Sequence, residues 1–393
     1  MASPVRIALL IGQDFSYSRN VLRGIRRFAI DREHWVFRTG PCSPQTIPML
    51  RAWNVAGIVL YTGDAPYVQA VRRLGKPVVY VSGILDPEDM AIVRVDDRKI
   101  GQMAAEHFIE RGFQHFGYVG YGDIAYSRRR QAGFEEPVAA AGGDFSAFNE
   151  VWAAESTNRD ETLSDSNDAM GQWIKSLPKP VAVLASNDKR AWQVLEVCRE
   201  NRLRVPEDVA VCGVDDDDLV CGLARPALSS VAVPAERIGF EAAQMLDRMM
   251  DGEQSAQTVL HPPLGVVTRQ SSDVLAIEDQ DLLAALQYIR VNAHRPIGVE
   301  DLLRVVPSAR RSLERKFRQH LGRTPLEEIR RAHLERARRL LAGTDLPTPV
   351  VAERSGFGNA RWLATVFRKH MGMTPLAYRR RFRLHEAKPT HSV

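Results

Sequence analysis

The chain has 393 residues, which is too long for one ordinary domain and suits two or three. Its hydrophobic content of 45% and charged content of 26% are typical of a globular protein, and no apolar run approaches the ~20 residues needed to cross a bilayer. The four cysteines show no CxxC spacing. Reduced thiols in the cytoplasm are therefore expected, rather than a disulfide framework or a zinc site.

The net charge of +5 is unevenly distributed along the chain. Residues 281–393 contain 23 Lys and Arg against 10 Asp and Glu, which gives +13, whereas residues 1–280 contain 30 against 38, which gives −8. A basic end on an acidic body indicates a polyanion partner for that end only. From charge alone, an Arg-rich solvated helical surface is an equally good interpretation.

Short apolar strands alternate with amphipathic helices between residues 5 and 270. This alternation predicts parallel sheets with helices on both faces, and a body of ~270 residues is expected to divide into two lobes because a single core stops growing near that size. The N-terminus passes directly into the first expected strand, which argues against a signal peptide. The expected strands are 6–11, 57–61, 77–82, 116–120, 182–185 and 209–214, with helices over 18–31, 99–111, 189–201 and 235–251.

The body contains polar residues at strand ends but no recognisable catalytic motif. Neither a glycine-rich phosphate loop nor HExxH, GxSxG or a metal-ligand cluster occurs, so no catalytic residue, metal or cofactor is predicted. Ligands of such sheets bind beyond the carboxyl ends of the strands, and a sugar there needs carboxylate and amide acceptors, Arg donors and an apolar ring. Asn187, Asp215 and Arg128 follow three different expected strands. They are therefore candidates for contacts with a sugar.

Acidic residues at helix starts have a second explanation, because they also complement the helix dipole. Asp96, Asp188 and Asp216 are expected to have this capping role. The four consecutive acids at 215–218 could suggest a cation site, but consecutive side chains point in different directions. One ligand-binding residue plus helix-start acids is the favoured interpretation.

Three segments of the body resemble the effector domain of LacI/GalR-type regulators, whose fold is shared with periplasmic sugar-binding proteins. They are Leu-Ala-Ser-Asn-Asp at 184–188, the stretch from Val205 to Asp216, and Leu-Ser-Ser-Val at 228–231. The N-terminal headpiece of those regulators is absent, since the first strand begins near residue 6. The resemblance implies effector contacts at Ser18, Arg19, Arg128, Asn187 and Asp215, with Phe15, Tyr17 and Trp192 as candidate stacking rings.

Beyond residue 270 the strand signal disappears. Leu282, Leu286 and Ile289 have helical spacing, and short helices separated by Gly, Pro and Ser follow. The expected organisation is a two-lobed α/β domain over 1–270, a linker over 271–280, an all-α domain over 281–385 and a tail over 386–393.

The all-α part contains a first helix-turn-helix pattern. A short helix with Leu302 and Val306 on its apolar face is followed by Ser308, which is a good N-cap for a basic second helix. Leu313 and Phe317 have i, i+4 spacing and would anchor that second helix in the core. In helix-turn-helix proteins, the second helix enters the major groove of DNA.

A second unit of the same kind follows at residues 349–369. Gly356 supplies the positive φ of a tight turn, and Asn359 can cap the next helix. The basic helix 326–342 between the units is expected to turn its apolar residues inward. The inward-facing residues are predicted to be Trp362, Leu363, Val366 and Phe367 in the second unit, and Leu334, Ala337 and Leu341 in the connecting helix.

These motifs resemble the AraC/XylS family of regulators over about 100 residues. The carrying segments are Leu-Gly-Arg-Thr-Pro-Leu at 321–326, Ser-Gly-Phe at 355–357 and Gly-Met-Thr-Pro-Leu-Ala-Tyr-Arg at 372–379. The resemblance implies that both units contact adjacent major-groove segments. Ser308 and Asn359 are assigned to the helix starts, Arg310, Arg311, Arg315, Arg361 and Thr365 to bases, and Arg318, Arg368 and Lys369 to phosphates.

The domain order, sensor first and AraC-type unit last, is similar to that of pentose-responsive operon regulators. The resemblance implies a cytoplasmic homodimer, expected to be an activator, that binds double-stranded DNA, a sugar such as D-xylose and RNA polymerase. The same regulator with another sugar or small metabolite is the nearest alternative. A transport-type sugar-binding protein and an enzyme acting on sugar phosphates are the more distant ones.

Overall fold

The computed structural model describes residues 4–152, 159–253, 257–274 and 279–382. The chain forms two compact units: an N-terminal unit of residues 1–108 with 114–274, and a C-terminal unit of residues 109–113 with 275–393. Among the described residues, no helix combines the length and the apolar character needed to span a membrane. The predicted tail at 386–393 and the part of the predicted linker at 275–278 lie outside the described residues.

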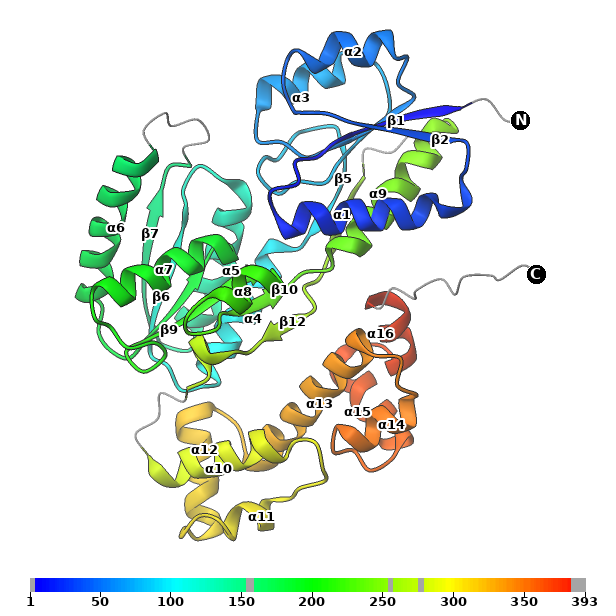
Figure 1. Cartoon of the computed structure of the whole chain (residues 1–393). Coiled ribbons are helices and arrows are strands. Elements are labelled where there is room, and N and C mark those ends of the chain that lie inside the picture. The colour runs from blue at the N-terminus through cyan, green and yellow to red at the C-terminus, as the bar shows by residue number, and fades with distance from the viewer. Residues whose placement is uncertain (1–3, 153–158, 254–256, 275–278, 383–393) are drawn as a thin grey trace. The chain divides into compact units, whose positions relative to one another are not determined.

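Two six-stranded sheets form the two lobes of the N-terminal unit (Figure 1). Lobe 1 has the strand order β11-β5-β4-β3-β1-β2, and lobe 2 has the order β12-β10-β9-β8-β6-β7. All pairings are parallel except that of β10 with β12. The chain therefore passes between the lobes three times, after β5, after β10 and after β11. The predicted two-lobed α/β architecture is confirmed.

The six expected strands all form, and six others were not predicted. The observed strands of lobe 1 are β1 (Val5–Leu10), β2 (Trp35–Thr39), β3 (Gly57–Leu60), β4 (Val78–Tyr80), β5 (Ala91–Val95) and β11 (Thr258–His261). Those of lobe 2 are β6 (His115–Tyr121), β7 (Asp144–Glu150), β8 (Val181–Ala185), β9 (Val209–Asp215), β10 (Ser229–Ala232) and β12 (Gly265–Val267). Several of the unpredicted strands lie at sheet edges, where one side of the strand is not buried and the apolar pattern is weak.

Helices cover both sheets. In lobe 1 they are α1 (Ser16–Phe28), followed by the 3₁₀ turn Ala29–Asp31, α2 (Thr46–Ala52), α3 (Ala65–Arg72) and α9 (Ala235–Met250). In lobe 2 they are α4 (Asp97–Ile109), α5 (Ala125–Ala140), α6 (Arg159–Ser176), α7 (Asp188–Glu200) and α8 (Asp218–Leu223). The helices expected over 18–31, 99–111, 189–201 and 235–251 are thus confirmed to within a few residues at each end.

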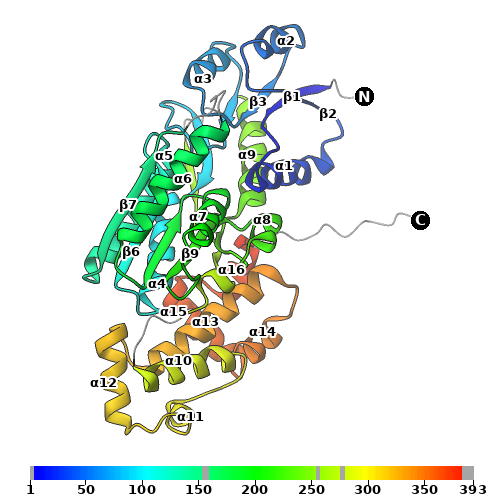
Figure 2. The same ribbon diagram turned by 60° about the vertical axis from the view of Figure 1, so that its left-hand side comes forward.

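Helices α1 and α9 pack unusually closely across lobe 1 (Figure 2). A Cβ atom on Gly24 would lie 1.9 Å from the carbonyl oxygen of Glu236, and one on Gly239 would lie 1.9 Å from that of Val21. Only glycine allows this backbone approach. The first helix after β1 is thereby fixed to a helix more than 200 residues later, and its N-terminus is held at the carboxyl edge of the sheet.

The N-terminal unit extends further along the chain than the sequence predicted. Residues Gln270–Ser272 form a 3₁₀ turn in which Ser271 and Ser272 are completely buried. Ser271 donates a hydrogen bond to the Val211 carbonyl at 2.7 Å, and Ser272 donates to Ser229 at 2.8 Å. The predicted linker therefore cannot begin at residue 271, because buried polar side chains tie this turn to β9 and β10.

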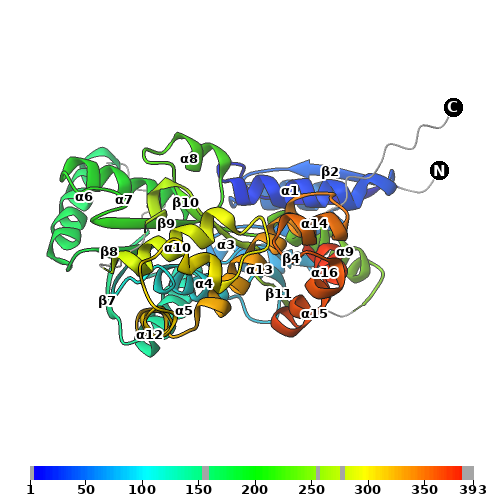
Figure 3. The same cartoon turned by 90° about the horizontal axis from the view of Figure 1, so that it is seen from below.

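The C-terminal unit is all-α, as expected, and has two small cores. The first lies among α10 (Gln280–Asn292), α11 (Val299–Leu303) and α12 (Arg310–Leu321), and the second lies among α14 (Thr348–Arg354), α15 (Ala360–Met371) and α16 (Pro375–Phe382). The long helix α13 (Pro325–Gly343) contributes Ile329 to the first core and Leu334, Ala337 and Leu341 to the second. Figure 3 shows α13 between the two groups of helices. The inward orientation predicted for those last three residues is confirmed.

Candidate effector site and DNA-binding surface

A small recess lies where the carboxyl ends of strands from both lobes meet. Lobe 1 contributes Phe15 and Ser16 at the start of α1. Lobe 2 contributes side chains from the start of α7, the end of β9 and the start of α8: Asn187, Asp188, Lys189, Asp215, Asp217 and Val220. This is the edge at which open α/β sheets bind ligands, and both predicted residues of lobe 2 that follow β8 and β9 line it.

Asp215 ends β9 in a strained conformation. Its φ is 108°, and that of Asp216 is 53°, so two consecutive non-glycine residues occupy the positive-φ region that is costly for them. Burial raises the pKa of Asp215 to about 6, with Asp97 and Asp217 adding to the rise and Arg130 opposing it. Among the described residues, no hydrogen bond to its carboxylate is found. A partly desolvated carboxylate without a partner can accept hydrogen bonds from a ligand.

The other acids of the 215–218 run have partners or lie at the surface. Asp216 pairs with Arg269 at 2.8 Å. Asp217 caps α8, accepting from the Leu219 amide at 3.1 Å, and Asp218 is exposed. The interpretation of one ligand-binding residue with helix-start acids therefore agrees with the geometry. Asp96 accepts from the Lys99 amide at the start of α4, as predicted. The predicted capping roles of Asp188 and Asp216 are wrong, because the N-caps of α7 and α8 are Asn187 and Asp217, and Asp188 accepts instead from the Asp217 amide.

Asn187 precedes α7 and has both ends of its amide occupied. Its Oδ1 accepts from the Arg190 amide at 2.8 Å, which makes it the N-cap of the helix. Its Nδ2 donates to the Tyr126 hydroxyl at 3.2 Å. The side chain is therefore held at the edge of the recess with its orientation fixed, and Tyr126 is brought in beside it.

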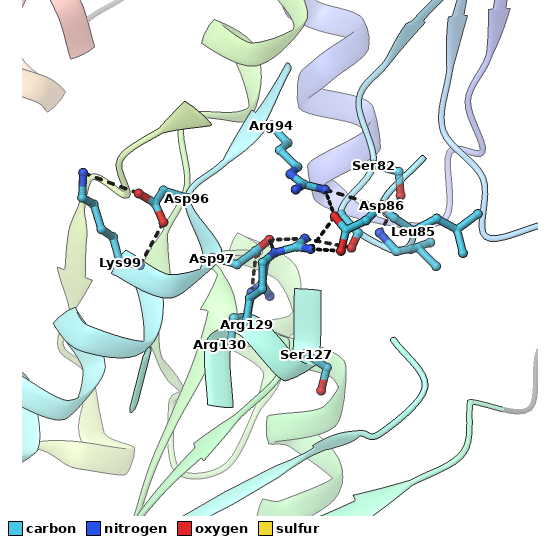
Figure 4. Close-up of polar contacts among 12 residues, drawn as sticks. Ser82, Leu85, Asp86, Arg94, Asp96, Asp97, Lys99, Ser127, Arg129 and Arg130 are labelled. Atoms are coloured by element: carbon cyan, nitrogen blue, oxygen red, sulfur yellow. Dashed lines mark hydrogen bonds and ion pairs between the residues drawn. The ribbon is translucent and has the colours of Figure 1, made fainter. Parts of the chain in front are cut away.

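Arg130 is an interior residue that the sequence reasoning missed. Its Nε donates to Asp97 at 2.9 Å (Figure 4). Its Nη1 donates to the Ser186 carbonyl, and its guanidinium lies 4.7 Å from the centre of the Tyr126 ring. Arg128, which the family resemblance suggested, is instead exposed, and its guanidinium donates to the Gly122 carbonyl at 3.0 Å. Successive side chains of a helix leave it about 100° apart, so neighbouring arginines of α5 face different surroundings.

A signal for Arg130 was present in the sequence of α5. Ser127, Phe134 and Val138 form a buried stripe at helical spacing, and Arg130 falls on the same stripe. An arginine is almost never buried without a specific partner. A charged residue on an apolar stripe therefore marks an interior polar site.

Arg129 and Asp97 connect the two lobes beside this cluster. Figure 4 shows Asp86 and Asp97 on either side of Arg129. The Arg129 guanidinium donates to both carboxylate oxygens of Asp86, in lobe 1, at 2.8 Å, and to Asp97, the first residue of α4, at 2.8 Å. Asp86 also accepts from Arg94 at 2.7 Å. Asp97 is 2% exposed and is the shared acceptor of two adjacent arginines.

Aromatic side chains of lobe 1 face this polar cluster. Tyr17 is buried, and its hydroxyl donates to the Val81 carbonyl at 2.9 Å. The rings of Tyr17 and Tyr61 are 5.9 Å apart. Burial raises the pKa of Tyr17, and the nearby groups Tyr61, Asp97 and Asp215 raise it further. Since Asp215 belongs to lobe 2, this electrostatic effect acts between the lobes.

The remaining predicted effector residues occupy different positions on α1. Ser18 is fully buried, and its hydroxyl has no hydrogen-bond partner among the described residues. Arg19 is partly exposed; it donates to the Gln13 carbonyl at 2.9 Å and forms an ion pair with Asp217 at 3.5 Å, across the lobes. Of the candidate rings, Phe15 lines the recess with the Lys189 ammonium 4.2 Å from its centre. Trp192 is half-buried in α7 and does not line the recess.

The first helix-turn-helix unit differs from the prediction at its helix start. Ala309, not Ser308, is the N-cap of α12. The Ser308 hydroxyl donates instead to the Asp281 carboxylate of α10, so the predicted capping role of Ser308 is wrong. Arg310 is paired with Glu300 at 2.7 Å and with Glu314 at 3.2 Å.

The predicted cations that remain on α12 are exposed. They are Arg311, Arg315 and Arg318, and no ion pair of theirs occurs among the described residues. On the opposite face, Leu313, Phe317 and Leu321 are buried as expected. The exposed face of α12 is therefore basic and available to an anionic partner.

The second unit has the turn and cap that the sequence predicted. Gly356 has a φ of +77°, and a Cβ there would lie 2.4 Å from Nε2 of His333 in α13. Asn359 caps α15, accepting from the Trp362 amide at 2.8 Å. The exposed predicted residues of α15 are Arg361, Thr365, Arg368 and Lys369.

Trp362 corrects the predicted core of α15. Leu363, Val366 and Phe367 are buried as expected, but Trp362 is 48% exposed. The three buried side chains already occupy the inward-facing arc of the helix. Trp362 lies about 100° from Leu363 around the axis, so its indole faces largely toward solvent.

Comparison with known proteins agrees with the division of the chain into an α/β unit and a helical unit. The model of a periplasmic binding protein-like domain matches residues 105–272, and that of a helix-turn-helix domain matches residues 303–381. The chain is similar to the xylose operon regulatory protein of Escherichia coli K12, with 28% identity over 370 residues that cover 92% of this chain and 93% of that protein. The corresponding protein of Haemophilus influenzae is 26% identical over 378 residues, covering 92% and 94%.

A solved structure described as the xylose-binding transcription activator xylR matches with a TM-score of 0.61 and 26% identity, covering 98% of this chain and 100% of that one. The fold and the two sites define a transcription regulator in which a sensing domain of the periplasmic binding protein type precedes a helix-turn-helix DNA-binding domain. Over most of its length the chain is similar to the xylose operon regulatory proteins. The predicted class, a sugar-responsive DNA-binding regulator, is thereby confirmed.

Proposed function

We propose that this protein regulates transcription in the cytoplasm in response to D-xylose bound between the two lobes, and that it activates genes of pentose catabolism. The observation that carries the proposal is the Asp215 carboxylate, which lines the recess between the lobes, has no hydrogen-bond partner among the described residues, and lies near the charges of Arg130 and Asp97. The similarity to xylose operon regulatory proteins supports the choice of sugar. The proposed role requires no catalysis.

The sugar is held by groups of complementary chemistry. Its hydroxyls donate to Asp215, and Asn187 and Arg130 supply oriented amide and guanidinium groups beside it. The rings of Tyr17, Tyr61 and Phe15 cover the C–H face of the sugar. Ser18 and Arg19 on α1 complete the lobe 1 side of the site, with Arg19 linked to Asp217.

Sugar binding favours the arrangement in which the lobes are in contact around it, because the bound ligand has higher affinity for that state. The Arg19–Asp217 pair and the Lys189–Phe15 contact join the lobes beside the recess. In a homodimer, a change in the angle between the lobes would alter how two C-terminal units meet two DNA half-sites. Activation would then proceed through a contact with RNA polymerase.

On DNA, the exposed cations of α12 and α15 are assigned to two kinds of contact. Arg311, Arg315, Arg361 and Thr365 contact base edges in the major groove, whereas Arg318, Arg368 and Lys369 contact phosphates. Arg310 is a weaker candidate, because Glu300 and Glu314 compete for its guanidinium. Asn359 acts indirectly, by capping α15, whereas Ser308 is bonded to Asp281 of α10 and is a weaker candidate.

The proposal is tested by measuring DNA affinity and transcription from a selected binding site with D-xylose, D-ribose, L-arabinose, D-glucose or no sugar. We expect D-xylose alone to change the affinity at least several-fold and to activate transcription. A response to another sugar would keep the regulator and replace the effector. No response to any sugar, together with no DNA binding, would contradict the proposal and favour a transport-type sugar-binding protein.

A further inference from the structure

The two helix-turn-helix units repeat with an offset of 50 residues, which allows their DNA-facing helices to be compared position by position. Helices α12 and α15 both have 12 residues and both end at a glycine in the left-handed conformation, Gly322 and Gly372. Leu313 and Phe317 are buried in the first unit, as are Leu363 and Phe367 in the second. Each exposed residue of α12 therefore has an equivalent in α15.

The exposed faces of the two helices differ in chemistry. Arg315, near the middle of the exposed face of α12, is replaced by Thr365 in α15, and the half-buried Ser312 is replaced by the exposed Trp362. Arg311 and Arg361 are equivalent and conserve the charge between the two units. The first helix thus presents a serine and a guanidinium group where the second presents an indole and a threonine.

Trp362 and Thr365 form an apolar pair on adjacent turns of α15. The Thr365 hydroxyl donates to the Arg361 carbonyl at 3.1 Å, so its proton is engaged within the helix and its methyl group is left to contact a partner. The Trp362 backbone is fixed by the Asn359 cap in the first turn, and N-terminal residues of a recognition helix are the ones that contact base edges.

The surroundings of this pair identify its partner as DNA rather than an apolar protein surface. Arg361, Arg368 and Lys369 lie on the same exposed face of α15, and no acidic residue occurs within the helix. The three cations match the phosphates of a polyanion, and the indole among them matches an apolar group that the polyanion presents at the same place. In the major groove, the thymine 5-methyl group is the apolar group that side chains contact.

We propose that Trp362, together with the methyl group of Thr365, recognises thymine in the DNA segment bound by α15, whereas Arg315 recognises guanine in the segment bound by α12. This inference rests on the proposed function, in which both helices enter the major groove. Arginine pairs bidentately with guanine, so the two units of one chain read different bases. The bound site is therefore asymmetric, with guanine in one segment and thymine in the next.

The test uses the full chain and double-stranded DNA selected from a random pool. Each thymine of the selected site is replaced in turn by deoxyuridine, which lacks the 5-methyl group and keeps the base pair. Affinities are measured for the wild type, for Trp362→Ala and Trp362→Phe, and for Val291→Ala as a control. Val291 is 72% exposed on α10, outside both helix-turn-helix units.

We expect one or two deoxyuridine substitutions to weaken binding of the wild type and of Val291→Ala by about five- to tenfold, at the lower end of the ~1–3 kcal/mol for discrimination at one base. Trp362→Ala should bind the thymine site correspondingly more weakly and show no further loss with deoxyuridine, and Trp362→Phe should be intermediate. A Trp362→Ala protein with the full wild-type deoxyuridine effect, or a site with no deoxyuridine effect at all, would overturn the inference alone. Failure to select any DNA would overturn the proposed function, and this inference with it.

Discussion

The two units of this protein place their functional side chains in opposite environments. In the N-terminal unit, Arg130 and Asp97 are buried and bound to each other, and Asp215 lines a recess between the two lobes. In the C-terminal unit, Arg315 and Arg361 are exposed on helices whose inner faces are held by leucine and phenylalanine. The candidate effector residues therefore also stabilise the fold of their domain, whereas the candidate DNA-contact residues lie on the surface of a domain whose core does not include them.

This difference has a thermodynamic consequence. Removing one partner of a buried charge pair leaves the other charge uncompensated, whereas removing a solvated charge changes stability little. Substitutions in the effector site should thus affect unfolding and function together, and substitutions on α12 and α15 should affect DNA binding alone. The following predictions test this separation, from the largest expected effect to the smallest.

Asp97→Ala should lower the free energy of unfolding by about 3–5 kcal/mol, because it leaves Arg129 and Arg130 without their shared buried acceptor. Urea unfolding followed by circular dichroism measures this. Asp86→Ala is the matched control: it also pairs with Arg129 but is 54% exposed, so its cost should be below about 1 kcal/mol. Equal costs for the two substitutions would contradict the distinction between buried and exposed pairs.

Arg315→Ala should weaken binding to the selected DNA about 10- to 100-fold, the effect of losing a bidentate contact with a base at ~1–3 kcal/mol, and leave the unfolding curve unchanged. Fluorescence anisotropy gives the affinity. Arg310→Ala provides the comparison, since Glu300 and Glu314 already engage that guanidinium, and it should lose no more than about threefold. The reverse order of the two variants would show that the ion pairs of Arg310 open on DNA.

Asp215 should make both stability and sugar binding depend on pH. Its pKa is raised to about 6 in the folded chain and is about 3.9 in an unfolded one, so the folded state binds the proton more tightly. Without sugar, the free energy of unfolding should fall as pH rises from about 4 to about 6, and Asp215→Asn should be more stable than the wild type at pH 7 by about 1–2 kcal/mol. Unfolding curves collected between pH 4.5 and 7.5 test this.

The same ionisation gives sugar affinity the opposite pH dependence. The ionised carboxylate accepts hydrogen bonds from hydroxyls better than the neutral acid does, so affinity for D-xylose should decrease as pH falls below about 6, where the carboxyl protonates. An affinity that does not change between pH 5 and 7.5 would remove Asp215 from the binding site.

Arg128→Ala should have the smallest effect. This guanidinium is exposed and bonded to the Gly122 carbonyl, so sugar affinity should change by less than about twofold and stability by less than about 0.5 kcal/mol. Arg130→Lys keeps the charge but loses the planar geometry that contacts Asp97 and Ser186, and it should weaken sugar binding at least tenfold. Similar losses of sugar affinity in Arg128→Ala and Arg130→Lys would indicate that Arg128 also contacts the sugar.

The contrast between the units also explains what the sequence could predict. On α12 and α15, the spacing of the buried leucines and phenylalanines determines which residues are exposed. Nine of the ten DNA-contact candidates could therefore be placed correctly, at the surface or at a helix start, from the sequence alone. The prediction that Trp362 is buried was wrong because an aromatic residue next to the apolar stripe was assumed to belong to it. The predicted N-cap role of Ser308 was wrong because its hydroxyl donates to Asp281, which is 27 residues away in the sequence.

The interior site was harder to predict, because its members come together only through the tertiary fold. Asp215 and Asn187 were found because each directly follows a buried strand, where parallel sheets bring side chains to one edge. Arg130 and Tyr61 were missed. The buried stripe of α5 marks Arg130 as an interior residue, but nothing local shows which groups it meets, or that Tyr61 lies opposite Tyr17. The edge strands β2 and β7 were missed for a related reason: they lack a continuous apolar run.

The most direct test of the central claim is calorimetric titration of D-xylose into the full chain and into Asp215→Asn. We predict saturable binding of one sugar per chain in the wild type, and a loss of at least tenfold in affinity in the variant, whose unfolding temperature should remain at or above that of the wild type. Equal binding by both proteins would contradict the assignment of Asp215 as the sugar's acceptor. The absence of binding to the wild type would contradict the proposal that this unit senses D-xylose.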